Sequence, residues 1–129
     1  MTAVALVQAF YAHLANGDKA RAYTLLDEHF TLKQADALPY GGEYKGREAL
    51  GDFFEKFNRY WQEFKTVTTD FYEVGNKVFA VSSIRGVNYQ NRLIETEMIQ
   101  IYVIENHLIV SAQPFYFIKV CRYRFELLP

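Results

Sequence analysis

The amino-acid sequence predicts an α+β protein in which three N-terminal helices pack on one face of a curved antiparallel β-sheet. Apolar residues recur at helical spacing up to residue 64, whereas from residue 65 onward they follow the two-residue period of strands. Two short turn signals, Gly75-Asn76 and Glu105-Asn106, divide the second half of the chain into hairpins. Helices followed by strands are typical of the segregated α+β class.

The N-terminal half is expected to form three helices and one short strand. The first helix covers residues 3–15 and ends at Asn16-Gly17, because glycine tolerates the left-handed conformation of a helix C-cap. Asp18 is a favourable N-cap for a second helix over about residues 18–28, and a short strand follows at residues 30–32. The third helix carries an aromatic stripe made of Leu50, Phe53, Phe54, Phe57, Tyr60, Trp61 and Phe64.

The C-terminal half is expected to form a four-stranded antiparallel meander. Its strands cover residues 65–74, 77–87, 92–104 and 107–119. Residues 98–104 are apolar on both faces, although an antiparallel sheet usually shows one face to water. We therefore expect a second copy of the chain to cover the outer face of the sheet in a homodimer. On the inner side, a curved sheet capped by helices leaves a cone whose mouth is a natural ligand pocket.

Composition and charge argue against several classes of function. With 129 residues, the chain is expected to form a single domain over residues 1–129. The net charge of −1 comes from scattered charges of both signs, so no basic stripe indicates nucleic acid as a partner. No apolar run reaches the length of a membrane span, and no signal peptide is recognisable. The single cysteine, Cys121, fits a reducing compartment, so we expect the protein in the cytoplasm.

A loop over residues 35–46 joins the helical half to the sheet, and loops on a rigid scaffold often carry function. Asp36 is the only carboxylate that precedes Pro39 in this loop, which makes it the candidate catalytic residue. If its side chain turned inward, burial would raise its pKa and make it a general base. The alternative is a solvated aspartate, or one that bonds the loop backbone as an Asx-turn.

Four segments, spread over most of the chain, resemble those of one superfamily. They are residues 10–18 (FYAHLANGD), 38–46 (LPYGGEYKG), 49–54 (ALGDFF) and 109–117 (IVSAQPFYF). With them the sequence resembles the SnoaL-like polyketide cyclases and their relative ketosteroid isomerase, within the nuclear transport factor 2 (NTF2)-like superfamily. The resemblance implies an NTF2-like (cystatin-like) cone. It leaves the activity open, because this fold hosts cyclases, isomerases, dehydratases, hydrolases and plain binding proteins.

The positions that would carry isomerase chemistry depart from that resemblance. Ketosteroid isomerase uses a carboxylate base together with a tyrosine and a protonated acid that bind the oxyanion. Here the tyrosine position falls on Phe10, the base position on or beside Leu38, and the second acid on Gln100. Phe10 cannot donate and Leu38 cannot accept a proton, whereas Gln100 still donates. Gln113 and Ile118 likewise stand where many SnoaL-like proteins have Arg and Asp, so the resemblance supports the fold and argues against the isomerase mechanism.

Eight side chains are expected to line the pocket or its mouth, and each group has a structural alternative. Aromatic residues of the third helix either wall a cavity or fill the core, and the loop tyrosine either donates into the mouth or anchors its loop. Glutamines buried on strands find partners in each other or in a ligand, and strand residues two apart share a face. The eight are Tyr11, Tyr40, Phe57, Trp61, Met98, Gln100, Tyr102 and Gln113.

Three functions fit these observations. The leading one is binding of a small apolar or carbonyl-bearing molecule, with cofactor-free acid–base chemistry of the isomerase, cyclase or hydrolase type in which Asp36 is the base and Tyr40 and Gln100 orient the ligand. The second is binding without chemistry, and the third is a structural dimerisation domain. No metal or cofactor is expected, because the three histidines lack metal-ligand spacing and no phosphate-binding glycine loop is present.

Overall fold

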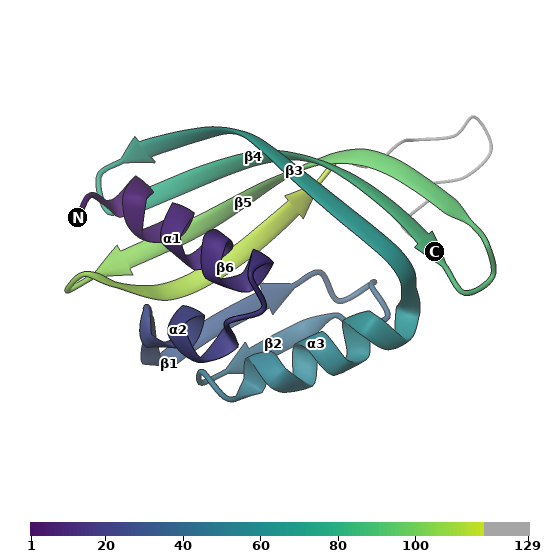
Figure 1. The fold of residues 1–129 in the computed structure, drawn as a ribbon, viewed down its shortest axis with the longest axis horizontal. Coiled ribbons are helices and arrows are strands. Elements are labelled where there is room, and N and C mark those ends of the chain that lie inside the picture. The colour runs from purple at the N-terminus through teal and green to yellow at the C-terminus, as the bar shows by residue number, and fades with distance from the viewer. Residues whose placement is uncertain (118–129) are drawn as a thin grey trace.

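The computed structural model describes residues 1–117, which form three helices and six strands (Figure 1). The helices are α1 (Ala3–Ala15), α2 (Lys19–Thr24) and α3 (Ala49–Tyr60). The strands are β1 (Leu26–Gln34), β2 (Gly42–Lys45), β3 (Trp61–Val74), β4 (Lys77–Asn88), β5 (Leu93–Glu105) and β6 (Leu108–Tyr116).

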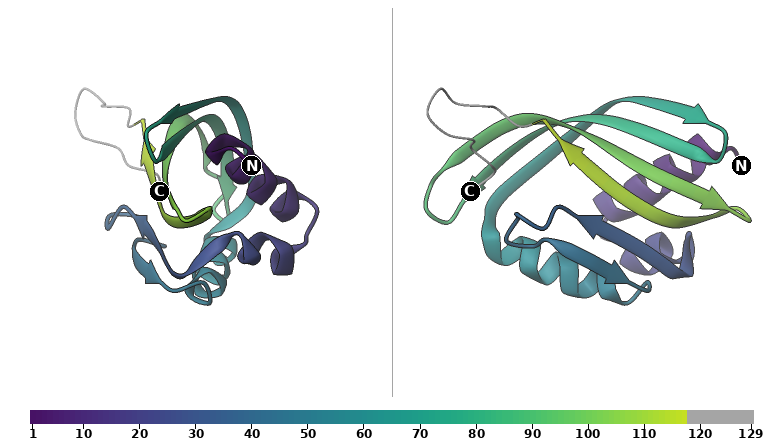
Figure 2. Two further views of the ribbon diagram at one scale, coloured as in Figure 1. Left: turned by 90° about the vertical axis from the view of Figure 1, so that its left-hand side faces the viewer. Right: turned by 180° about the vertical axis from the view of Figure 1, so that it is seen from behind.

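All six strands belong to one sheet, in the order β2-β1-β6-β5-β4-β3. Neighbouring strands pair antiparallel, except that β1 runs parallel to β6. The sheet curves without closing, and α1 and α2 lie at its open side (Figure 2). These features confirm the predicted α+β class with an antiparallel-dominated sheet. Among the described helices, none is long and apolar enough to cross a membrane.

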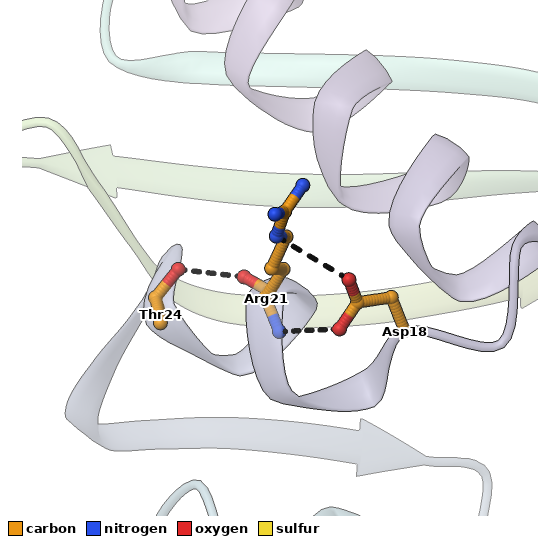
Figure 3. A network of polar contacts seen from close by, with 3 residues as sticks. All are labelled: Asp18, Arg21 and Thr24. Carbon is orange, nitrogen blue, oxygen red and sulfur yellow. Dashed lines mark hydrogen bonds and ion pairs between the residues drawn. The ribbon is translucent and has the colours of Figure 1, made fainter.

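Local capping determines where the first two helices begin. Thr2 Oγ1 accepts a hydrogen bond of 3.0 Å from the amide of the third residue of α1. Gly17 turns the chain after α1 at a φ of +73°, in the left-handed region that glycine tolerates. Asp18 then caps α2, since its Oδ1 accepts from the Arg21 amide over 3.1 Å and its Oδ2 lies 3.4 Å from Arg21 Nε (Figure 3). Thr24 Oγ1 donates to the Arg21 carbonyl oxygen over 2.6 Å and satisfies one carbonyl of the last turn.

The second helix is shorter than the sequence predicted. α2 ends at Thr24 and Leu26 already begins β1, so the predicted helix end at residue 28 was wrong. Leu26 is placed at helical spacing from the preceding apolar residues, which is why the pattern favoured a longer helix. Asp27 Oδ2, however, accepts a hydrogen bond of 2.7 Å from the His29 amide, and such local bonds compete with a helix.

The third helix also ends earlier than predicted. α3 stops at Tyr60, and Trp61 and Phe64 belong to β3. Their three-residue separation imitates one helical face, but a bulge between Trp61 and Glu63 puts both side chains on the inner face of the sheet. Trp61 packs against Gly86 of β4, where an added Cβ would lie 2.7 Å from the indole ring. Glycine at this position therefore leaves the space that the indole occupies.

The predicted meander is confirmed as β3 to β6, with tight turns after Val74 and after Glu105. Residues 118 and 119, the predicted end of the last strand, lie outside the described residues. The structure adds β2, which lies inside the predicted 35–46 loop and pairs with β1. β2 has four residues, of which only Tyr44 is buried, so it is too short for a two-residue period to show.

Strand pairing determines which side chains face the helices. Ser82 of β4 pairs with Met98 of β5, and both are buried on the inner face, where Gln100 lies two residues further along. On the opposite face Ile99 pairs with Phe115, and these side chains are 43% and 50% exposed. The sheet thus has an inner face that is covered by the helices and a largely uncovered outer face, on which apolar side chains lie beside charged ones such as Arg85 and Glu97.

Candidate functional site

A cavity of about 520 Å³ lies between α1, α3 and the inner face of the sheet. Its volume is in the range of small-molecule sites. Phenylalanine rings from both helices and two strands form much of its wall, namely Phe10, Phe30, Phe53, Phe54, Phe57 and Phe64. Five of the eight predicted pocket residues line it, namely Tyr11, Phe57, Met98, Gln100 and Tyr102.

A second cavity, of about 650 Å³, lies at the start of α1 and the tips of the two hairpins. Its polar lining residues are all exposed and belong to turns or to the N-terminus: Thr2, Asn76, Asn106 and His107. The aromatic cavity, in contrast, has buried polar groups that point to one place. It is therefore the candidate site.

Three polar side chains meet in the wall of the aromatic cavity. Tyr11 comes from α1, whereas Gln100 and Tyr102 come from β5. Gln100 Nε2 donates to Tyr102 OH over 2.8 Å and lies 3.5 Å from Tyr11 OH. Tyr102 OH donates to Tyr11 OH over 2.6 Å. We call these three residues the tyrosine cluster.

The donors of the tyrosine cluster have a defined order. The Gln100 amide nitrogen only donates, so the Tyr102 oxygen accepts from it and the Tyr102 hydrogen points to Tyr11. The Tyr11 oxygen is therefore an acceptor, and its own hydrogen has no acceptor among the residues that the structure describes. Because Tyr11 lines the cavity, this hydrogen can be donated to a bound molecule.

Burial keeps the hydroxyl groups of the tyrosine cluster protonated. It raises the pKa of Tyr102 well above the usual value of a tyrosine. Burial also raises the pKa of Tyr11, although the hydrogen bonds from Gln100 and Tyr102 act in the opposite direction. At neutral pH both hydroxyl groups are hydrogen-bond donors rather than bases.

A second polar group lines the same cavity, where β1 and β6 end. Tyr116 OH donates to Gln34 Oε1 over 3.2 Å. Behind the cavity wall, the hydroxyl group of Tyr40 lies close to that of Tyr116, and its oxygen accepts a hydrogen bond from Trp61 Nε1 over 3.1 Å. Burial raises the pKa of Tyr116 to about 12 and raises the pKa of Tyr40 as well. These tyrosines therefore also stay protonated at neutral pH.

Four predicted site residues lie outside the cavity lining. Tyr40 and Trp61 are buried behind it, where their rings pack against lining phenylalanines, Tyr40 against Phe57 and Trp61 against Phe64. Gln113 pairs with Ile101 on the outer face of the sheet, away from Gln100. Asp36, the predicted base, is exposed in the loop between β1 and β2. A molecule inside the cavity would thus meet neither the Asp36 carboxylate nor the Gln113 amide.

The lining carries no formal charge among the described residues, since it includes no carboxylate, lysine, arginine or histidine. Within residues 1–117, no group of three or more His, Cys, Asp and Glu side chains is arranged to hold a metal ion. A charged group that is buried without a partner is costly, so such a lining suits an uncharged molecule.

Two polar lining residues, Gln34 and Tyr116, were not predicted from the sequence. The signal for Gln34 was present, because it continues the two-residue period of Phe30 and Leu32 and puts a polar side chain at an inward position. The short strand predicted over residues 30–32 stopped before it. Tyr116 stands four residues after Ala112, which also lines the cavity, so alternation along the predicted strand 107–119 puts both on one face.

Comparison with known proteins identifies the family. The sequence signature of the SnoaL-like domain matches residues 7–112, which is most of the chain. The chain belongs to the SnoaL-like domain family. No curated protein matches the sequence significantly.

Several solved structures have the fold of this SnoaL-like domain. An NTF2-like protein of unknown function from Burkholderia pseudomallei K96243 is 17% identical, with a TM-score of 0.82 over 91% of this chain and 92% of its own. TerC, co-crystallised with polyporic acid, is 10% identical, with a TM-score of 0.81 over 89% and 91%. A protein assigned to the SnoaL-like polyketide cyclases, from Jannaschia sp. CCS1, is 10% identical, with a TM-score of 0.74 over 88% and 84%. They confirm the predicted NTF2-like fold and, at these identities, show the fold alone.

Proposed function

We propose that this SnoaL-like domain binds a small, uncharged and largely apolar molecule in the aromatic cavity. The observation that carries the proposal is the order of donors in the tyrosine cluster. Gln100 and Tyr102 direct their hydrogens at oxygens within the cluster and leave the Tyr11 hydrogen for a bound molecule. The molecule therefore carries an oxygen, such as that of a carbonyl group, which accepts from Tyr11.

The rest of the lining supports an apolar body for this molecule. Aromatic rings offer large contact areas, and the described lining residues offer no countercharge. TerC, which shares the fold, was crystallised with polyporic acid, and this supports a small organic molecule as the type of ligand.

Binding without chemistry is the form of the proposal that the geometry favours. General acid–base catalysis needs a base within hydrogen-bond reach of the proton that it removes. Asp36 is exposed outside the lining, and burial raises the pKa of the tyrosines that line the cavity. These groups therefore orient a ligand rather than remove a proton from it.

A fluorescent ketone tests the binding proposal. Prodan, 6-propionyl-2-(dimethylamino)naphthalene, is uncharged, and its emission shifts to the blue in an apolar site. We expect saturable binding to the wild type, and binding to Tyr11→Phe that is about five- to tenfold weaker, because one hydrogen bond is lost. The analogue with a propyl group in place of the propionyl group should bind both proteins equally.

The place of binding is tested by a matched pair of bulky substitutions on β3. Thr66 lines the cavity, whereas the neighbouring Lys65 is exposed and pairs with Arg85 on the outer side. Thr66→Trp should weaken prodan binding at least tenfold, and Lys65→Trp should leave it unchanged. Binding that survives in Thr66→Trp, or that is absent from the wild type, would overturn the proposal.

The second candidate function is cofactor-free acid–base chemistry on a carbonyl compound. It is supported by Tyr11, which could donate to a developing enolate oxygen, and by the polyketide cyclase assignment of the Jannaschia protein. Exchange of the α-hydrogens of 2-tetralone in D2O, followed by NMR, tests it. Exchange that wild-type protein accelerates and Asp36→Asn does not would support an enzyme with Asp36 as base. If exchange in the presence of the protein is no faster than in buffer, binding is the only proposed function of the cavity that remains.

We also propose that a second copy of the chain covers the outer face of the sheet. Apolar side chains from three strands are about half exposed there, among them Val67, Ile99 and Phe115. In a two-fold symmetric dimer the same patch of both copies forms the interface, so a second copy of this chain is sufficient to cover it. The single cysteine supports the cytoplasm as the compartment of this dimer.

A further inference from the structure

We infer that Gln34 is a second anchor for the bound molecule and that its amide hydrogens bind a second acceptor on that molecule. The inference rests on the proposed binding function and adds the substitution pattern of the ligand. One oxygen would lie at Tyr11 and another at Gln34. Gln34 lines the cavity, and its side chain is among the few buried polar ones, at 5% exposure.

The orientation of the Gln34 amide follows from its hydrogen bond with Tyr116, which lies beside the buried pair of Trp61 and Tyr40. The indole N–H can only donate, so the Tyr40 oxygen is the acceptor in their 3.1 Å hydrogen bond. Tyr40 is fully buried, and its hydroxyl group lies close to that of Tyr116. Tyr116 in turn donates its own hydrogen to Gln34 Oε1 over 3.2 Å.

The other half of the Gln34 amide is then left for a ligand. Because Oε1 accepts from Tyr116, the two hydrogens of Nε2 remain, and no described residue accepts them. Among the described residues no fully buried side-chain nitrogen or oxygen lacks a partner, so Nε2 is accessible from the cavity that Gln34 lines. An acceptor on the bound molecule would complete the hydrogen bonding of Gln34, as an oxygen at Tyr11 would complete that of the tyrosine cluster.

The two anchors are separate in the structure. The tyrosine cluster belongs to α1 and β5, whereas Gln34 and Tyr116 belong to β1 and β6, and no hydrogen bond joins the two groups among the described residues. Met98 pairs with Tyr116 and lies two residues before Gln100 on the same face, so an apolar side chain stands beside both groups. This arrangement suits an uncharged, largely apolar compound with two carbonyl-type oxygens.

A series of acetylnaphthalenes tests the second anchor. Dissociation constants are measured by calorimetry for 2-acetylnaphthalene and for the 2,6-, 2,7- and 1,5-diacetyl isomers, which place the second carbonyl at different separations. The proteins are wild type, Gln34→Leu and the control Lys33→Leu, whose exposed side chain points to the other face of β1. We expect at least one diacetyl isomer to bind wild type and Lys33→Leu about five- to tenfold more tightly than 2-acetylnaphthalene.

Gln34→Leu should abolish this preference, whereas Lys33→Leu should keep it. If Gln34→Leu does not fold because Tyr116 loses its acceptor, the double variant Gln34→Leu/Tyr116→Phe removes both partners and carries the same expectation. A preference that persists without Gln34, or that is absent from the wild type while 2-acetylnaphthalene binds, would overturn the inference and leave the proposed function intact. If none of these compounds binds the wild type, the proposed function and the inference both fail.

Discussion

Trp61 and Tyr40 are joined by a buried hydrogen bond of 3.1 Å between the indole nitrogen and the phenolic oxygen. Trp61 begins β3, whereas Tyr40 lies in the loop between β1 and β2. Tyr44 OH donates to the Tyr40 carbonyl oxygen over 2.9 Å and holds the same loop from β2. In the loop predicted to carry chemistry, Tyr40 is thus a buried support behind the cavity, whereas Asp36 is exposed.

Tyr40→Phe should destabilise the protein by about 1–3 kcal/mol, because it leaves the buried Trp61 N–H without its acceptor. The free energy of unfolding in urea measures this effect. Tyr72→Phe is the matched control, since Tyr72 is 55% exposed and should change stability by less than about 0.5 kcal/mol. Equal stabilities of the two variants would mean that the Trp61–Tyr40 bond adds nothing to the folded state.

Gly86→Ala should destabilise the fold by about 1–3 kcal/mol, because the added methyl group would overlap the Trp61 ring. Gly51 offers the opposite case within α3, where nothing lies within 4 Å of an added Cβ. Gly51→Ala should therefore stabilise by about 0.5–1 kcal/mol, since alanine favours a helix. Thermal unfolding shows whether each variant is more or less stable than the wild type. A Gly86→Ala variant as stable as the wild type would contradict the packing of Trp61.

Stability should fall as the pH rises from about 10 to about 12. Burial raises the pKa of Tyr116 to about 12, whereas a tyrosine of the unfolded chain titrates near 10. In this window the unfolded chain releases a proton that the folded chain retains, so each such tyrosine lowers the free energy of unfolding by about 1.4 kcal/mol per pH unit. Below pH 10 the contribution of Tyr116 is fully present.

Urea titrations at pH 9, 10 and 11 measure this slope, and Tyr116→Phe should reduce it. A slope that is the same in Tyr116→Phe and wild type would show that Tyr116 ionises alike in both states.

The homodimer remains a prediction, and the outer face supplies its test. Ile99→Lys puts a charge in the middle of the apolar patch, next to its pair residue Phe115, and should convert a dimer to a monomer in native mass spectrometry. Tyr89→Lys is the control, because Tyr89 is an exposed aromatic side chain in the turn between β4 and β5. A wild-type monomer at micromolar concentration would contradict the prediction.

Much of the fold could be predicted because its signals are local. The cap at Asp18, the two-residue period after residue 65 and the turn at Gly75 each act within a few residues, and each has its expected structural result. The errors arose where a local pattern had two solutions. Trp61 and Phe64 fit a helix by their spacing, and only pairing with β4 through a bulge made them strand residues.

Part of the candidate site could also be predicted, because strand alternation is a local signal. Met98, Gln100 and Tyr102 share a face by alternation, which the sequence alone determined, and all three line the cavity. The sequence by itself determined the class, the meander and the aromatic character of the interior. Only the tertiary structure decided that Tyr11 meets Tyr102, that Trp61 donates to Tyr40 and that Tyr116 donates to Gln34. These residues come from distant segments, and no local pattern encodes which donor finds which acceptor once water is excluded.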